Sequence, residues 1–188
     1  MEEKVLVAYG STNGSTERIA EIVAGVLRTS GLSAEVLPAR SVTDLAPYRA
    51  VVVGSALYAG RWHKDARHFV RRHRGALTKR SVWLFSSGPL DATASERDIP
   101  PVPGVKRAMI RLDVCEHVTF GGCLTEGAEG RIARVIIRNG KGGDFRDFAA
   151  IEKWAAGVAR ELSAARPRGE GVLSRLSRHA RLGCPRSR

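Results

Sequence analysis

Apolar residues along the chain form short unbroken runs that alternate with longer stretches of helical spacing. The short runs predict five β-strands, at residues 4–9, 34–37, 50–54, 81–85 and 118–121. Apolar positions that recur every three or four residues predict helices, at residues 16–29, 63–77, 105–112 and 148–162. Strands and helices in alternation are typical of a parallel sheet with helices on both faces. The pattern therefore predicts an α/β fold of three layers around a five-stranded parallel sheet.

The segments between these elements carry their own signals. Gly31 follows the first helical stretch and is expected to end that helix. Residues 41–47 are expected to form a clipped helical turn. The polar, proline-bearing segment 91–104 is expected to be an exposed loop.

The composition changes close to residue 166. We therefore predict a domain at residues 1–165 and a basic, flexible tail at residues 166–188. The tail contains seven arginines and one glutamate, which is half of the net charge of +12. Its apolar residues could share one side of a short helix, opposite the arginines. Such a helix would lie on an anionic membrane surface, and a solvated tail is the other interpretation.

The composition of the whole chain sets its class. Its 188 residues are 43% hydrophobic and 27% charged, which is typical of a soluble globular domain. No apolar run approaches the roughly 18 residues that cross a bilayer, and the first residues lack the pattern of a signal peptide. We expect a cytoplasmic protein.

The three cysteines, Cys115, Cys123 and Cys184, form no CxxC pair, so no metal site is predicted. We interpret them as small buried or tail thiols, and one reactive thiol is the alternative.

Small polar residues fill the loop after the first predicted strand. They are Ser11, Thr12, Asn13, Gly14, Ser15 and Thr16. The loop leads directly into a helix, whose free N–H groups and dipole favour a phosphate. The hydroxyls add donors, and Gly14 permits close approach of the backbone. A plain N-cap at Ser15 or Thr16 is the alternative, but a cap needs only one such residue. We predict a phosphate site.

Other phosphate sites do not fit the residues present. No G-x-G-x-x-G follows the first strand, and no G-x-x-x-x-G-K-[ST] occurs in the chain. A phospho-acceptor receiver domain needs acidic residues after the first and third strands, where Gly10 and Ser55 stand. Dinucleotide-binding, P-loop and receiver functions are therefore excluded.

Three further loops of small residues follow the third, fourth and fifth predicted strands. Their residues are Ser55, Ala56, Leu57, Tyr58, Ala59, Gly60 and Trp62, then Ser86, Ser87, Gly88 and Pro89, and last Gly121 and Gly122. Ligands of open parallel sheets bind where the carboxyl ends of the strands meet their loops. Tyr58 or Trp62 could stack on a flat ring, and backbone N–H groups could bind the polar edge of a flavin. We predict that these residues bind a cofactor together with the phosphate loop.

The loop from Ser11 to Thr16 is similar to the FMN-phosphate loop of flavodoxins, so the chain resembles the flavodoxin superfamily. More narrowly it resembles the menaquinone-dependent protoporphyrinogen oxidase family. Three stretches carry this resemblance: residues 54–60 followed by 62–64, residues 69–73, and residues 142–144 together with Trp154 downstream. The resemblance implies a flavodoxin-like sandwich that binds FMN, oxidises protoporphyrinogen and passes electrons to a quinone. It also implies a long insertion, for which residues 91–112 occupy the corresponding place. No catalytic residue is assigned, because His63 near the third loop is equally well explained as a neighbour of a helix N-cap.

The charge of the predicted domain bears on the choice of function. Shuttle flavodoxins are typically acidic, whereas residues 1–165 are basic. This favours an FMN-dependent oxidoreductase over a non-catalytic electron-transfer flavodoxin. Five cationic residues lie near the loop after the third predicted strand: Arg61, Lys64, Arg67, Arg71 and Arg72. They could bind the propionates of a porphyrinogen or form a solvated helix face.

The expected small-molecule partner is a quinone or a porphyrinogen-like molecule. The tail is expected to contact an anionic membrane. Because the chain has no nucleic-acid motif, no nucleic-acid partner is expected.

Overall fold

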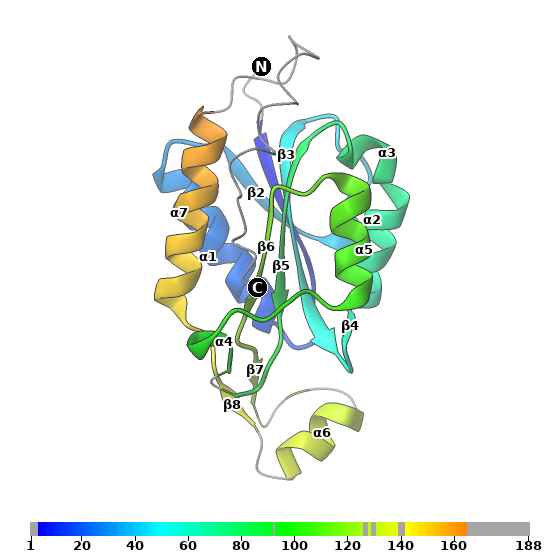
Figure 1. The fold of residues 1–188 in the computed structure, drawn as a ribbon, viewed down its shortest axis with the longest axis vertical. Coiled ribbons are helices and arrows are strands. Elements are labelled where there is room, and N and C mark those ends of the chain that lie inside the picture. The colour runs from blue at the N-terminus through cyan, green and yellow to red at the C-terminus, as the bar shows by residue number, and fades with distance from the viewer. Residues whose placement is uncertain (1–3, 92, 126–127, 129–130, 139–141, 165–188) are drawn as a thin grey trace, which may run out of the picture.

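The computed structural model describes residues 4–91, 93–125, 128, 131–138 and 142–164. Five parallel strands form its central sheet: β1 Lys4–Gly10, β2 Ala34–Pro38, β3 Tyr48–Tyr58, β5 Ser81–Ser87 and β6 Glu116–Phe120. They lie in the order β2-β1-β3-β5-β6 (Figure 1). All four pairings on this path are parallel. The predicted α/β class with a five-stranded parallel sheet is confirmed.

Helices cover both faces of the sheet, because side chains of one strand point alternately to either side. Val5 and Val7 of β1 pack against α1 Ser15–Thr29 and α7 Phe148–Ala164. Leu6 and Ala8 face the opposite layer, which contains α2 Lys64–Arg72, α3 Arg74–Leu77 and α5 Pro103–Leu112 (Figure 1). Each face therefore has its own hydrophobic core, and the strands between them are apolar on both sides, as expected for a covered parallel sheet.

The third strand is longer than predicted, and this matters for the site. It runs to Tyr58 and then turns back into a short antiparallel strand, β4 Arg61–Trp62. The turn uses left-handed backbone at Ala59 (φ 47°) and Gly60 (φ 72°). Residues 55–58, expected in a loop, therefore belong to the strand. Small side chains do not end a strand when its neighbours continue to pair with it.

Three smaller expectations were also wrong. The helical turn predicted at 41–47 is a 3₁₀ turn, η1 Ala39–Ser41. The helix predicted at 63–77 breaks at His73, between α2 and α3. The predicted exposed loop at 91–104 contains one helical turn, α4 Thr93–Glu96, and the start of α5. These errors concern single helical turns and a break within a helix, which leave little periodic pattern in the sequence.

Residues 91–112, which the resemblance gave as the place of an insertion, supply α5, whose Val105 and Leu112 are buried on the sheet. That these residues are an insertion stays a prediction. A further unit, made of β7 Cys123–Leu124, α6 Arg131–Arg138 and β8 Gly143–Asp144, lies beyond the carboxyl ends of the parallel strands (Figure 1). Two-residue strands leave no periodic pattern, so the sequence did not predict this unit.

The basic tail at residues 166–188 lies outside the described residues, as does Cys184. The domain boundary and the tail's membrane contact therefore stay predictions. Within the part of the chain that the structure describes, no helix combines the length and apolar character needed to span a membrane.

Candidate functional site

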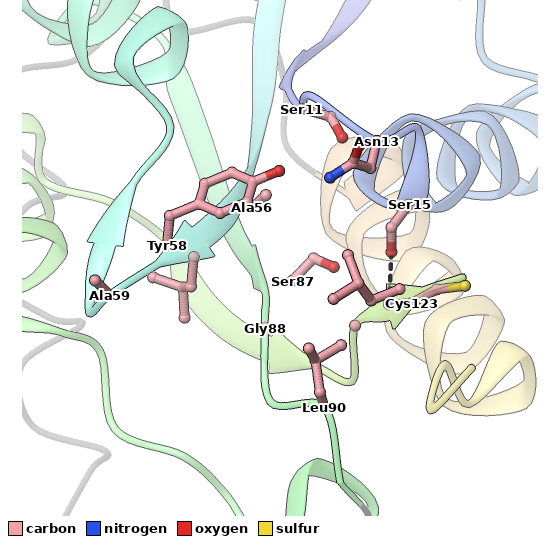
Figure 2. A pocket seen from close by; sticks show the side chains of 13 residues that line it. Ser11, Asn13, Ser15, Ala56, Tyr58, Ala59, Ser87, Gly88, Leu90 and Cys123 are labelled. Carbon is pink, nitrogen blue, oxygen red and sulfur yellow. Dashed lines mark hydrogen bonds between the residues drawn. The ribbon is translucent and has the colours of Figure 1, made fainter. Parts of the chain in front are cut away.

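A pocket opens at the carboxyl edge of the sheet, where four chain segments meet (Figure 2). It encloses about 570 Å³ of space, part of it open to solvent. Thirteen residues line it: Ser11, Asn13 and Ser15 after β1, residues 56–59 at the end of β3, Ser87, Gly88 and Leu90 at the end of β5 and beyond it, and residues 122–124 after β6. The strand order brings these segments together, because parallel strands present their carboxyl ends at one edge.

The loop after β1 has the features of an anion site. Gly14 adopts left-handed backbone (φ 75°) at the N-cap of α1, and no side chain caps this helix end. Ser11 Oγ and Thr16 Oγ1 are buried and have no hydrogen-bond partner among the described residues. Unpartnered buried hydroxyls cost free energy, so their retention points to a ligand that supplies the missing partner. This observation supports the phosphate site over a plain N-cap.

Ser15 connects the phosphate loop to the segment after β6. The backbone N–H of Cys123 donates to Ser15 Oγ at 3.0 Å, across 108 residues of sequence (Figure 2). The hydroxyl can still donate its own proton into the pocket. Ser15 therefore fixes two walls of the pocket relative to each other.

Tyr58 and His63 approach the same loop from the side of β3. The Tyr58 hydroxyl lies 3.4 Å from the backbone nitrogen of Thr12, and Figure 2 shows it directed toward the loop that carries Ser11 and Asn13. His63 is the N-cap of α2: its Nδ1 accepts the backbone N–H of Asp65 at 3.3 Å. Burial lowers the pKa of His63, and Asp65 opposes this shift. The interpretation of His63 as part of a helix cap is thus confirmed.

The loops after β5 and β6 pack closely on their neighbours. A Cβ added to Gly121 would lie 1.9 Å from the carbonyl oxygen of Phe145, and one added to Gly88 would lie 2.8 Å from Leu57 Cδ1. The N–H of Gly88 donates to Phe120 O at 3.0 Å, and that of Gly122 donates to Pro89 O at 2.9 Å. These two amides are therefore used inside the loops in the free protein, and the prediction that backbone N–H groups of these loops bind a flavin edge falls to the other amides.

Several predicted site residues lie behind the pocket wall. Trp62 is buried, and its indole N–H donates to Ser86 Oγ at 2.8 Å, so it faces the core and does not present its ring to the pocket. Ser55 Oγ accepts the N–H of His63 at 2.9 Å and supports the β3–α2 connection. The remaining predicted residues that do not line the pocket are Thr12, Gly14, Thr16, Gly60, Pro89 and Gly121.

Sequence reasoning missed three lining residues, Leu90, Cys123 and Leu124. None of them belongs to a motif, and only the order of the strands places them opposite Tyr58. Cys123 contributes a thiol whose pKa is raised by burial. Cys115 is exposed, contrary to the expectation of a buried thiol.

Comparison with known proteins defines the class of this fold and site. A family model described as a flavodoxin domain matches residues 6–138. The chain therefore belongs to the flavodoxin domain family. No curated protein matches the chain.

Solved structures share the fold at low sequence identity. Rubredoxin:oxygen oxidoreductase from the anaerobe Desulfovibrio gigas is 14% identical with a TM-score of 0.58, and the match covers 87% of this chain but 37% of that one. A flavodoxin from the domain Archaea is 15% identical (TM-score 0.58, 85% of this chain, 99% of that one). A cysteine-to-serine mutant of flavodoxin from Pseudomonas aeruginosa is 19% identical (TM-score 0.57, 85% and 99%).

Family membership implies that the chain binds FMN, and the residues present fit this cofactor. The phosphate fits the loop after β1, where Ser11 Oγ and Thr16 Oγ1 lack partners. The flat ring fits the apolar part of the pocket, beside Tyr58 and Leu90.

Proposed function

We propose that the chain is an FMN-dependent oxidoreductase of the protoporphyrinogen oxidase type, which passes electrons from a reduced substrate to a quinone. The observation that carries this proposal is the cationic segment beside the pocket. Residues 61–74 contain six Lys or Arg and one Asp, and Arg61, Lys64 and Arg67 are exposed. Lys64, Arg67 and Arg40 all lower the pKa of His63, whose ring contacts the phosphate loop, so their field reaches the pocket edge.

The lining of the pocket suits a planar apolar reactant with an anionic periphery. Leu57, Leu90, Leu124 and Tyr58 supply apolar surface, and the cations beside Tyr58 attract carboxylates. A porphyrinogen supplies apolar rings and two propionates for the cations, and an uncharged quinone supplies a flat apolar ring for the lining residues. FMN supplies hydride or electron transfer when it is bound. The role of the chain's own residues is to bind and orient the reactants against it.

Proton exchange in this proposal goes to solvent through the open mouth. Of the lining residues that the structure describes, only Tyr58 and Cys123 are titratable. The raised pKa of Cys123 keeps that thiol protonated at neutral pH. No side chain on the pocket wall is thus assigned as a general base.

Charge reversal at the pocket mouth tests the proposal. Arg61→Glu should raise KM for protoporphyrinogen about tenfold and leave KM for menadione, an uncharged quinone, within twofold. Lys79→Glu is the matched control, because Lys79 is exposed near the amino end of β5, at the other edge of the sheet. Steady-state kinetics of the FMN-loaded protein measure both constants. Absence of turnover with wild-type protein, or an equal effect of the two variants, would refute the proposal.

A non-catalytic electron-transfer flavodoxin is the second candidate. The favouring observation is size, because the match covers 99% of the archaeal flavodoxin but 37% of the oxygen oxidoreductase. A shuttle should reduce menadione slowly and an electron-accepting protein fast. Stopped-flow reoxidation of the reduced protein with each acceptor distinguishes the two functions.

The predicted contact of residues 166–188 with anionic membrane would hold the protein at a surface in which quinones dissolve. Sedimentation with anionic vesicles, with and without these residues, tests it. Equal sedimentation of both forms would exclude a role for the tail.

A further inference from the structure

We propose that His63 is a phosphate-binding residue, which donates its Nε2 proton to the FMN phosphate beside Thr12. The inference concerns the cofactor and does not depend on the redox partner proposed above. It adds a donor from α2, 51 residues away from the loop that the sequence identified.

The hydrogen bonds of the ring define which nitrogen carries the proton. Nδ1 accepts the backbone N–H of Asp65, so the neutral imidazole holds its proton on Nε2. Nε2 lies 3.2 Å from Thr12 Oγ1. The donor side of the ring thus faces the phosphate loop, and the acceptor side is used by the helix cap.

The backbone of His63 is held firmly in this position. Its N–H lies 2.9 Å from Ser55 Oγ and 3.0 Å from the carbonyl oxygen of Ala56. A Cβ added to Gly10, directly before the phosphate loop, would lie 3.3 Å from His63 Cβ and 3.1 Å from the nitrogen of Ala66. The first turn of α2 therefore packs on the end of β1, and forms a second wall next to the loop.

Two hydroxyl groups of the phosphate loop have no hydrogen-bond partner among the described residues. They are Ser11 Oγ and Thr16 Oγ1, both buried. A phosphate that satisfies these hydroxyls would lie within the loop that His63 contacts through Thr12. Hydrogen bonds from a rigidly held donor to an ionised acceptor are among the strongest in proteins.

The charges around His63 predict how its proton responds to the phosphate. Facing the ring are Asp65, Lys64 and Arg67 of α2, Arg40 of η1, and Tyr58 of β3. Burial and the three cations favour the neutral ring in the free protein. A bound phosphate dianion adds two negative charges and favours the imidazolium. The added proton would go to Nδ1, which would exchange the N–H of Asp65 for the Asp65 carboxylate, whose Oδ2 lies 3.8 Å away. FMN binding should therefore take up a proton, and the affinity should rise as the pH falls from 8 to 6.5.

Two substitutions separate the helix cap from the phosphate contact. His63→Asn keeps an acceptor for the N–H of Asp65, since Asn is a good N-cap, but removes the distal donor. His63→Gln places an amide donor at about the reach of Nε2. His68→Asn is the matched control, because His68 is exposed on the same helix and its Nδ1 contacts Arg71.

The measurement is titration of the apoprotein with FMN and with riboflavin, which lacks the phosphate, followed by flavin fluorescence at pH 7. His63→Asn should weaken FMN about tenfold and riboflavin less than twofold. His63→Gln should recover most of the FMN affinity, and His68→Asn should bind as wild type. Calorimetry in buffers of different ionisation enthalpy should show proton uptake with wild type and none with either His63 variant.

Three results would overturn the proposal: unchanged FMN affinity in His63→Asn, equal weakening of FMN and riboflavin, or proton uptake that persists in His63→Gln. If circular dichroism shows that His63→Asn does not fold, proton uptake by His63→Gln decides alone. If the wild-type protein does not bind FMN, the assignment of FMN as the cofactor is wrong. If it binds FMN tightly but shows no turnover, only the proposed oxidoreductase function is wrong.

Discussion

Thr16→Val should stabilise the apoprotein and weaken FMN binding at the same time. Thr16 is fully buried in the first turn of α1, and its Oγ1 has no partner among the described residues. Valine has nearly the same shape, so the substitution removes the hydroxyl and leaves the packing almost unchanged. The two opposite effects follow from one atom, which is buried without a partner in the free protein and acquires one in the complex.

The magnitudes come from the cost of the unpartnered hydroxyl. Burying such a group costs about 1–3 kcal/mol, and its removal should raise the free energy of unfolding of the apoprotein by about 1 kcal/mol. A hydrogen bond to a charged group contributes about 1.5–3 kcal/mol. Loss of this bond should therefore raise the Kd for FMN by roughly tenfold to a hundredfold. The Kd for riboflavin should change little.

Urea unfolding of the apoprotein and fluorescence titration with both flavins measure these effects. Thr119→Val is the matched control, because Thr119 is also buried but its hydroxyl donates to the carbonyl oxygen of Ile99 at 3.3 Å. That variant should lose about 1 kcal/mol of stability and keep its FMN affinity. An apoprotein destabilised by Thr16→Val, or one that binds FMN as tightly as wild type, would refute the assignment of this hydroxyl to the phosphate.

Two further predictions concern the sheet behind the pocket. Gly54→Ala should lower the free energy of unfolding by about 1–3 kcal/mol or more in urea titrations, because the new Cβ would lie 2.0 Å from Cζ of the buried Phe85; unchanged stability would show that the ring can move aside. Burial lowers the pKa of His117 from 6.5 to about 4, beside Ser86 Oγ at 2.9 Å. Between these values the unfolded chain binds the extra proton, so stability is full above pH 6.5 and falls toward pH 4 by on the order of 2 kcal/mol. His117→Gln should flatten the dependence of the free energy of unfolding on pH between 4 and 6.5, as measured by urea titrations. An unaltered pH dependence would show that other groups cause it.

The fold was largely predictable because its signals are local. The apolar spacing of residues 16–29 and 148–162 describes one helical face each, and the structure places helices there, as α1 and α7. The loop from Ser11 to Thr16 was predictable for the same reason, since a phosphate loop draws its donors from consecutive residues. Element ends were less predictable: β3 continues through Tyr58 because β5 pairs with its Ser55 and Ala56, and β4 pairs with its Leu57 and Tyr58.

The site beyond that loop depends on contacts between distant residues. Tyr58 or Trp62 was expected to stack on the cofactor, but the reversal at Ala59 and Gly60 carries Trp62 into the core against Ser86. Backbone N–H groups of the loops were expected to be able to bind a flavin edge, but that of Gly122 donates to Pro89 O. Neither outcome has a signal in the neighbouring residues.

The sequence by itself determined the alternation of strands and helices, the basic charge and the chemistry of the phosphate loop, because each of these depends on residues that are neighbours along the chain. The tertiary structure decided which loops meet. A parallel sheet joins consecutive strands through long crossovers, so residues at its carboxyl edge become neighbours only when the strand order is set. The approach of His63 to Thr12 and of Cys123 to Ser15 exists only in the folded chain.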